Sequence, residues 1–225
     1  MSRSVSFVIP VLNESGRIAS LLDHLTARFP DAQLVVVDGG SSDDTVAQAM
    51  PRCSQLLLSN PGRALQMNLG AEVASGDYLL FLHADSHPEF DGPALQRELS
   101  DSPAWGFCPI RLRGAGWSLR LIGYCMNLRS RLTRVATGDQ MLFLRRELLE
   151  KSGGFDAIPL MEDVAFCKRL RRLAPPHIVS QPVTTSSRRW RERGVWRTVL
   201  QMWWLRLAYF CGVSPQRLWQ QYYGR

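Results

Sequence analysis

The first hundred residues alternate short apolar runs with segments whose apolar residues recur at helical spacing. The apolar runs cover residues 5–11, 34–37, 55–58 and 78–82, and the helical segments include 17–29 and 62–75. Strands that are apolar at every position are typical of a parallel sheet covered by helices on both faces. The alternation therefore predicts a Rossmann-like α/β layer with a mostly parallel central sheet flanked by helices.

The rest of the chain gives a weaker pattern. Residues 137–145 are predicted to form another strand, and helices are predicted at 147–152, 163–173 and 195–213. Residues 101–135 are broken by glycine and proline and give no clear assignment. Because neither an internal repeat nor a low-complexity linker interrupts the sequence, we expect residues 1–225 to form a single domain.

The charge of the chain is unevenly distributed. Residues 1–110 contain 6 Arg and 13 Asp or Glu, whereas residues 111–225 contain 21 Lys or Arg and 7 Asp or Glu, for a net charge of +7. An acidic half suits a cation and a basic half suits an anion, and the same asymmetry is compatible with nucleic acid or acidic lipid. A nucleic-acid-binding module would interleave aromatic with basic residues on an exposed sheet, whereas the aromatic residues here gather on one helical face. We therefore do not expect a nucleic-acid partner.

The cysteines indicate a reducing compartment. The five residues lie far apart and include no C-x-x-C pair, which argues against zinc-ribbon and thioredoxin-like sites. Free thiols are typical of cytosolic proteins. The N-terminus has no signal-peptide architecture, and a run of about 18 uncharged apolar residues, as a membrane span needs, is absent. The sequence thus favours a cytoplasmic protein.

Polar residues follow three of the predicted strands. Asn13 and Glu14 come after the first strand, Asp38 after the second, and His83 and Asp85 after the fourth. In an open parallel sheet, ligands bind outside the carboxyl ends of the strands. Three carboxylates that meet there repel one another unless a cation or hydrogen-bond donors offset the repulsion. The sequence therefore predicts a ligand site at this edge, although helix capping would explain Glu14 or Asp38 taken singly.

Four segments of the chain carry motifs. They read FVIPVLNE at 7–14, VDGGSSDDT at 37–45, GDYLLFLHAD at 76–85, and GGFD at 153–156 followed by Glu162-Asp163. Together, and in this order, they resemble the family 2 glycosyltransferases. The resemblance implies a GT-A fold, a nucleotide-diphospho-sugar donor, a divalent cation (Mn²⁺ or Mg²⁺) and inversion at the anomeric carbon.

The resemblance also divides the chain into a nucleotide-sugar half at 1–100, an acceptor half at 101–190 and a C-terminal helical tail at 191–225. Two segments point to a subgroup, and they read GRALQMN at 62–68 and LHADS at 82–86. They are similar to a compact bacterial subgroup that is associated with arsenosugar biosynthesis.

On the donor side, the resemblance assigns roles residue by residue. Pro10 and Glu14 would line the base and ribose pocket, and Asp38 would accept hydrogen bonds from the base or ribose. Asp85 would be the metal-binding carboxylate of the family's Asp-x-Asp motif, from which the sequence departs because His83 replaces the first Asp. Imidazole suits Mn²⁺ better than Mg²⁺. His83 would either ligate Mn²⁺ or hydrogen-bond the nucleotide without touching the metal.

The resemblance places the catalytic base at Asp163. A single displacement needs a group that takes the proton of the acceptor hydroxyl and a positive charge that meets the leaving diphosphate. Glu162 would hold an acceptor hydroxyl. Arg63 and Arg189 are the candidates for the diphosphate, because the planar guanidinium fits phosphate oxygens.

Three further residues are predicted on the acceptor side. Trp190 follows Arg189 in a segment that loosely resembles an Arg-Trp element of processive relatives. Asp139 and Gln140 form a polar pair that interrupts the apolar strand predicted at 137–145. We expect all three side chains to face the acceptor.

The helix predicted at 195–213 has two interpretations. Its apolar residues share one face, and they are Trp196, Val199, Leu200, Trp203, Trp204, Leu207, Phe210 and Cys211. That face would either pack on the domain or lie on the inner face of a membrane, with arginines at the anionic headgroups. The second interpretation predicts a peripheral membrane contact and would suit a lipid-linked acceptor.

The alternative function is that of a nucleotidyltransferase on a related α/β fold. Such an enzyme would carry a glycine-rich loop with Lys or Arg after the first strand. Residues 11–14 read VLNE and contain no such cluster. The sequence therefore favours the inverting glycosyltransferase.

Overall fold

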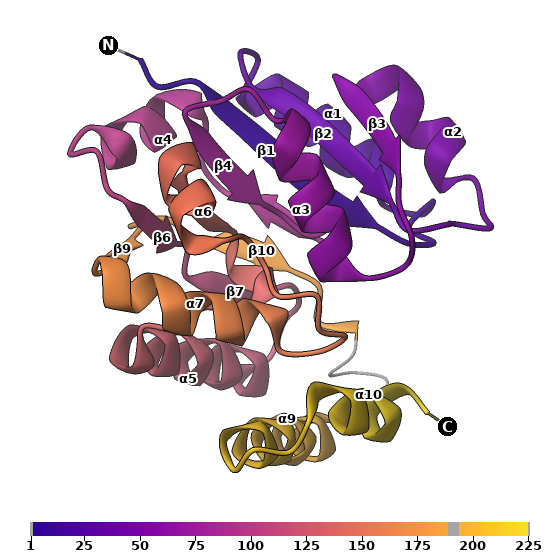
Figure 1. Cartoon of the computed structure of the whole chain (residues 1–225), viewed down its shortest axis with the longest axis vertical. Coiled ribbons are helices and arrows are strands. Elements are labelled where there is room, and N and C mark those ends of the chain that lie inside the picture. The colour runs from indigo at the N-terminus through magenta and orange to yellow at the C-terminus, as the bar shows by residue number, and fades with distance from the viewer. Residues whose placement is uncertain (1, 189–193, 225) are drawn as a thin grey trace.

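A seven-stranded sheet forms the centre of the molecule (Figure 1). The computed structural model describes residues 2–188 and 194–224, without the side chains of residues 195 and 196. The strands, in spatial order, are β3 (Gln55–Leu58), β2 (Gln33–Asp38), β1 (Val5–Val11), β4 (Tyr78–Phe81), β8 (Leu142–Arg145), β6 (Trp105–Phe107) and β9 (His177–Ile178). The first four run parallel, and β8 lies antiparallel between β4 and β6. The predicted mostly parallel sheet is confirmed, with strand ends that differ by one residue from those expected.

The sheet divides the core into two layers, as β1 shows. Successive side chains of a strand point to opposite faces. Phe7 and Ile9 pack on one face beneath α1 (Ile18–Arg28), and Val8 packs on the other beneath α3 (Arg63–Val73). Gly70 allows α3 to approach closely, because a Cβ there would lie 2.5 Å from Val8 Cγ1. Helices thus cover both faces, which explains why β1 is mostly apolar and is buried along its whole length.

A second, three-stranded sheet takes one of its strands from residues 101–135, the segment without a clear sequence pattern. Its order is β5 (Ser86–Pro88), β10 (Val183–Thr185) and β7 (Ile110–Leu112). α5 (Trp117–Thr133) packs on β7 through Leu119 and Ile122. The other helices are α2 (Thr45–Ala49), η1 (Met50–Arg52), α4 (Gly92–Leu99), α6 (Arg146–Ser152) and α7 (Glu162–Leu173). The small sheet holds the chain that returns from β9 against the loop after β4.

The strand predicted at 137–145 is wrong in its first half. Gly138–Gln140 form a 3-10 helix, η2, and the strand begins only at Leu142. The cause is a reciprocal cap between Thr137 and Gln140, in which each side chain pairs with the other residue's backbone. The Gln140 side chain is fully buried and also accepts a hydrogen bond from Ser130 Oγ at 2.7 Å. Gln140 therefore holds the turn in place, and its predicted contact with an acceptor is not retained.

Two helices, rather than one, end the chain. α9 (Val195–Phe210) is followed by α10 (Pro215–Tyr223), which begins at a Ser214 cap with proline in its first turn. The helix predicted at 195–213 therefore ends three residues early. Leu205 and Ala208 of α9, with Leu218 and Tyr222 of α10, are buried in the same core layer as α3. Within the described part of the chain, no helix has the length and apolar character needed to cross a membrane.

Candidate active site

The ends of β1 and β2 are level and are fixed to α3. Val11 pairs with Asp38 in the parallel register, so the loops after both strands leave the sheet together. Gln66 of α3 is buried, and its Nε2 donates to the carbonyl oxygens of Val11 and Val37 at 2.8 Å each. Gln66 has no role predicted from the sequence, because the pattern of α3 does not reveal that this polar side chain turns inward. The Gln66 amide thus fixes the ends of β1 and β2, at which the predicted site lies.

Asp38 is buried at the end of β2, and its carboxylate orders the loop that follows. Oδ2 accepts the backbone N–H groups of Gly40 at 2.9 Å and Ser41 at 2.8 Å, and Oδ1 accepts the Ser41 hydroxyl. Gly40 has a φ of 92°, a left-handed conformation that favours glycine. The motif at 37–45 is therefore a rigid turn whose carboxylate is held by its own backbone.

The loops after β1 and β2 are also tied to each other. The backbone N–H of Asn13 donates to Ser41 Oγ at 2.8 Å, and Asn13 Oδ1 accepts the N–H of Ser42 at 2.9 Å. Glu14 forms an ion pair with Arg17 at 2.6 Å. Pro10 is buried within β1, opposite Val37. These contacts bring Pro10, Glu14 and Asp38 to one edge of the sheet, as predicted.

Asp85, after β4, lies in a field of negative charge. Burial is the largest cause that raises the pKa of its carboxyl group, and the charges of Asp139 and Glu14 raise it further. Ser86 Oγ donates to Asp85 Oδ1 at 3.3 Å. Asp139 belongs to η2 and Glu14 to the loop after β1, so carboxylates from two other segments act at Asp85. Such a cluster favours the binding of a cation or of several hydrogen-bond donors.

The donor set fits a divalent cation only together with a ligand. Carboxylate oxygens suit Mg²⁺ and Mn²⁺, and Mg²⁺ is usually bound by one or two carboxylates plus phosphate oxygens. Among the described residues, no group of three or more His, Cys, Asp or Glu side chains is arranged to hold a metal alone. Asp85, with Asp139 near it, matches the partial protein shell of a metal–diphosphate site.

Asp163 opens α7, and two backbone N–H groups fix its carboxylate. Gly138 donates to Oδ2 at 2.8 Å, and Val164 donates to Oδ1 at 2.7 Å. Burial, followed by the charge of Glu162, raises the pKa of Asp163 to about 6, although Arg63 and the two N–H groups act in the opposite direction. A carboxylate with this pKa is suited to accept a proton near neutral pH.

Arg63, the first residue of α3, links the two sides of the site. Its Nε lies 3.5 Å from Glu162 Oε1, and its Nη2 contacts the ring of His83. Burial lowers the pKa of Arg63, but Glu162, Asp163 and Asp139 outweigh it, so that the pKa is raised. Arg63 is therefore a fixed positive charge between the acidic start of α7 and the loop after β4.

Gly138 occupies a position that a larger residue would not fit. A Cβ there would lie 2.3 Å from Arg63 Nη2 and 2.3 Å from His83 Cε1. The absent side chain thus lets Arg63 and His83 pack over the turn whose N–H binds Asp163. The sequence did not reveal this role, because the contact joins residues 25 positions apart.

The motif at 153–156 fixes the approach to α7. Asn68 of α3 donates from Nδ2 to the carbonyl of Phe155 at 2.8 Å and accepts the Phe155 N–H at 2.9 Å. Gly154 has a φ of 72° and lies against Asn68. Glu162, the first residue of α7, is buried. Arg189 and Trp190 lie outside the described residues.

The mostly parallel seven-stranded sheet, with helices on both faces, defines a GT-A type of fold. The mannosyltransferase PcManGT from Pyrobaculum calidifontis, solved with GDP-Man and Mn²⁺, is 21% identical and superposes with a TM-score of 0.65, covering 92% of this chain and 61% of that one. Glucosyl-3-phosphoglycerate synthase from Mycobacterium tuberculosis, solved with Mn²⁺, UDP and phosphoglyceric acid, is 22% identical with a TM-score of 0.59, covering 94% and 79%. These likenesses confirm the predicted fold.

The family follows from the sequence match. Residues 6–146, more than half of the chain, match the model of Glycosyl transferase family 2, and the chain belongs to that family. A PGL/p-HBAD biosynthesis glycosyltransferase of Mycobacterium bovis (strain BCG / Pasteur 1173P2) is 36% identical over 88 residues. That match spans 36% of this chain and 34% of the relative, so the chain aligns with about a third of the relative's length.

Proposed function

We propose that the chain is an inverting glycosyltransferase that moves a sugar from a nucleotide-diphospho-sugar to an acceptor hydroxyl with the help of a divalent cation. The observation that carries the proposal is the environment of Asp163. Its half-buried carboxylate has a pKa of about 6 and is oriented by the N–H groups of Gly138 and Val164, in the first turn of the helix beside the strand-end cluster. Such a group is suited to be a general base.

The donor would bind along the ends of β1, β2 and β4. Pro10, Glu14 and Asp38 would contact the nucleotide, since all three lie on the edge where parallel sheets bind ligands. Asp85 would hold the cation, which supplies positive charge to the diphosphate when bound. The negative field of Asp139 and Glu14 at Asp85 supports this assignment.

The proton of the acceptor hydroxyl would pass to Asp163. As the hydroxyl oxygen bonds to the anomeric carbon, the bond from that carbon to the diphosphate breaks on the opposite face, which inverts the configuration. Arg63 would stabilise the charge that develops on the diphosphate, because it is a cation fixed beside both Glu162 and His83. Arg189 remains a second candidate for this role.

The acceptor would approach from the side of α7 and η2. Glu162 is buried and forms an ion pair with Arg63. Its negative charge also raises the pKa of Asp163. Asp139 of η2 and Trp190 remain proposed acceptor contacts. His83 contacts Arg63, which favours a role at the nucleotide or diphosphate over metal ligation. The proposed division into a nucleotide-sugar half at 1–100, an acceptor half at 101–190 and a tail at 191–225 follows this arrangement.

Three further assignments stay proposals. The segments GRALQMN and LHADS support membership of the subgroup associated with arsenosugar biosynthesis. The unpaired, widely spaced cysteines support a cytoplasmic location. A contact of α9 with an anionic membrane is supported by its exposed apolar residues.

A panel of nucleotide-diphospho-sugars, incubated with Mn²⁺ and tested for hydrolysis and for transfer to simple alcohols, tests the proposal. We expect at least one donor to release nucleoside diphosphate in a Mn²⁺-dependent reaction, with an inverted anomeric configuration by NMR. Release of pyrophosphate from a nucleoside triphosphate and a sugar phosphate would instead establish the nucleotidyltransferase. A retained anomeric configuration would contradict the single displacement.

A further inference from the structure

Two helices that are far apart in the sequence each expose a stripe of large apolar side chains. On α5 the stripe consists of Trp117, Leu121, Tyr124, Leu128 and Leu132, and on α9 it consists of Leu200, Trp203, Trp204, Leu207 and Phe210. Within each stripe the residues recur mainly every three or four positions, so they share one helical face. Trp117, Trp203, Leu132 and Phe210 are each 73–78% exposed. Exposed apolar patches of this kind mark interaction sites.

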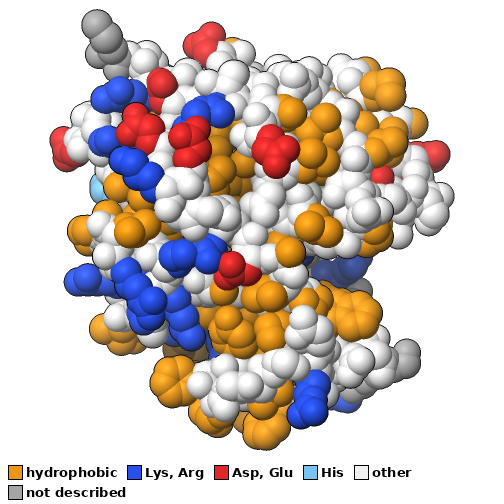
Figure 2. All heavy atoms as spheres, viewed as in Figure 1, with side chains coloured by type: hydrophobic (Ala, Val, Ile, Leu, Met, Phe, Trp, Pro, Cys, Tyr) orange, Lys and Arg blue, Asp and Glu red, His pale blue; other side chains and the backbone are white. Residues whose placement is uncertain are grey.

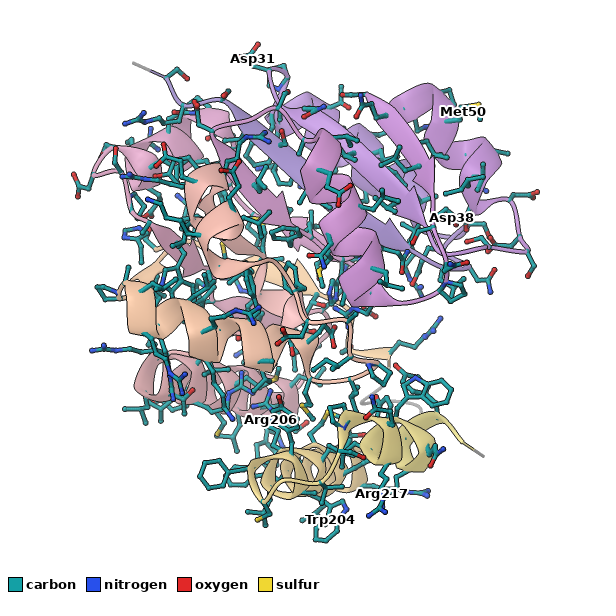
Figure 3. All side chains as sticks on the ribbon, in the orientation of Figure 1. Asp31, Asp38, Met50, Trp204, Arg206 and Arg217 are labelled. Carbon is teal, nitrogen blue, oxygen red and sulfur yellow. The ribbon has the colours of Figure 1, made fainter. Side chains whose placement is uncertain are left out.

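Neither stripe is buried in the core of the protein. α5 is attached through Leu119 and Ile122, and α9 through Leu205 and Ala208. The interpretation in which the Trp-rich face of α9 packs on the domain is therefore wrong, because the helix buries its other face. In Figure 3 the labelled Trp204 points away from the body of the protein.

Both helices lie at one end of the molecule. Figure 1 has the longest axis vertical, and α5, α9 and α10 occupy its lower part, opposite β1, β2 and β3. Lys168 of α7 lies 5.0 Å above the Tyr209 ring and 5.7 Å from that of Phe210, which anchors α9 beside α7. Figure 2 shows hydrophobic side chains over the C-terminal helices and a band of Lys and Arg above them.

The positive charge of α5 and of the C-terminal helices indicates an anionic partner. Residues 117–134 and 194–225 contain four Arg each and no Asp or Glu. Arg120, Arg131, Arg134, Arg197 and Arg217 are exposed. An anionic partner would therefore meet favourable charge on both helices.

A second copy of the chain fits this surface poorly. A two-fold interface places the same surface on both sides, so the arginines of one copy would face those of the other with no acidic residue from either segment between them. An anionic lipid surface instead offers an apolar layer for the stripes and phosphates for the arginines. Trp and Tyr side chains are also enriched where protein meets the headgroup region.

We infer that α5 and α9 together form a docking surface for an anionic membrane, with their apolar stripes in the headgroup layer and their arginines at lipid phosphates. The sequence indicated an apolar face only for α9. The proposed surface adds α5, to which the sequence pattern assigned no structure. It lies beside the acceptor side of the site, since α9 packs on α7, the helix that begins at Glu162 and Asp163.

Vesicle sedimentation tests the inference. The full chain is mixed with vesicles of phosphatidylcholine alone or with an equal part of phosphatidylglycerol, at low and high salt. We expect binding to the phosphatidylglycerol vesicles at low salt, and a marked loss at high salt because screening weakens the attraction to the headgroups. Absence of binding to these vesicles would overturn the inference.

Single substitutions separate the two helices. Trp203→Ser and Leu132→Ser should each reduce binding about tenfold, because each variant loses the burial of one large apolar side chain in the membrane. Leu58→Ser, at a residue that is 70% exposed at the opposite end of the sheet, is the matched control and should bind normally. All three sites are exposed, so the melting temperatures should agree with that of the wild type. An effect of Trp203→Ser without one of Leu132→Ser would remove α5 from the surface and overturn the two-helix inference.

The charge and the oligomeric state complete the test. Arg131→Gln combined with Arg197→Gln should weaken binding and its salt dependence, whereas Arg28→Gln on α1 should not. In sedimentation velocity, the wild type and Trp203→Ser should show the same distribution of monomers and oligomers. A dimer that this substitution dissociates, with no vesicle binding by the wild type, would assign the face to a second copy instead.

Discussion

The backbone N–H of Gly138 donates to Oδ2 of Asp163 at 2.8 Å, and this bond joins the turn after α5 to the first residues of α7. The buried Gln140 amide stabilises this turn. The side chains of Arg63 and His83 pack against Gly138, where a Cβ of residue 138 would be. The orientation of the proposed base therefore depends on a residue that has no side chain.

Gly138→Ala should impair catalysis more than folding. The new methyl group would collide with the ends of the Arg63 and His83 side chains, so either these side chains or the turn must shift. The first shift would displace the positive charge of Arg63, and the second would lengthen the hydrogen bond to Asp163. We expect kcat to fall about 10- to 100-fold, the scale of a misplaced catalytic group. Gly123→Ala on α5, whose Cβ would lie an ordinary 3.9 Å from the carbonyl oxygen of Ile110 in β7, is the control and should keep full activity. Equal activity of the two variants would show that Gly138 does not position the base.

The pH–rate profile should follow the titration of Asp163. Because the deprotonated form accepts the proton, kcat should rise with pH and level off above a pKa of about 6. The charge of Glu162 raises that pKa, so Glu162→Gln should move the acidic limb of the profile to lower pH. Glu150→Gln, an exposed carboxylate on α6, should leave the profile in place. A shift to higher pH in Glu162→Gln would contradict the assignment.

Gln66→Met should destabilise the protein. The substitution removes the amide that now donates to the carbonyls of Val11 and Val37 inside the core, and of these two the Val11 carbonyl still accepts the N–H of Gly39. An unsatisfied buried polar group costs roughly 1–3 kcal/mol, so we expect the free energy of unfolding in urea to fall by about 2 kcal/mol. Gln220→Met on the exposed face of α10 should change it little. Equal urea midpoints for Gln66→Met and the wild type would mean that the strand ends do not need this link.

Chelation of divalent ions should weaken donor binding through Asp85. The diphosphate would bind together with the cation, so calorimetry with a nucleoside diphosphate should give at least about tenfold weaker binding in EDTA than in Mn²⁺. Asp85→Asn should bind weakly in both buffers, whereas Asp31→Asn should behave as the wild type, because Asp31 is exposed before the start of β2, at the opposite end of that strand from Asp38. Equally tight binding of the wild type with and without Mn²⁺ would remove the metal from the proposed mechanism.

The sequence predicted the parts of the site that depend on strand ends. β1, β2 and β4 are buried on both faces, so their apolar runs were visible, and Glu14, Asp38 and Asp85 followed from where those runs stop. The sequence also contains an indication of the turn at η2, since Thr137 and Gln140 have the spacing of a capping box. The apolar residues that follow favour a strand instead, and this explains the wrong prediction at 137–140. The Ser214-Pro215 pair likewise marks the start of α10.

Other features depend on contacts that local patterns do not contain. Gln66, Asn68 and Gly138 each bind a segment at least 25 residues away, so their roles appear only when the chain is folded. The helical wheel of α9 identified an apolar face but not its environment. Leu205 and Ala208 lie on the opposite side and form the actual contact with the core.

The most direct test of the central claim is the turnover of Asp163→Asn with a donor that the wild type uses. Asparagine retains the size of the side chain but does not take the acceptor proton, so kcat should drop about 10²–10⁴-fold. Binding of the nucleoside diphosphate with Mn²⁺, measured by calorimetry on the same preparation, should stay within about twofold, because the donor would be held by Glu14, Asp38 and Asp85. A variant that binds the nucleotide normally and transfers sugar at the wild-type rate would contradict the account.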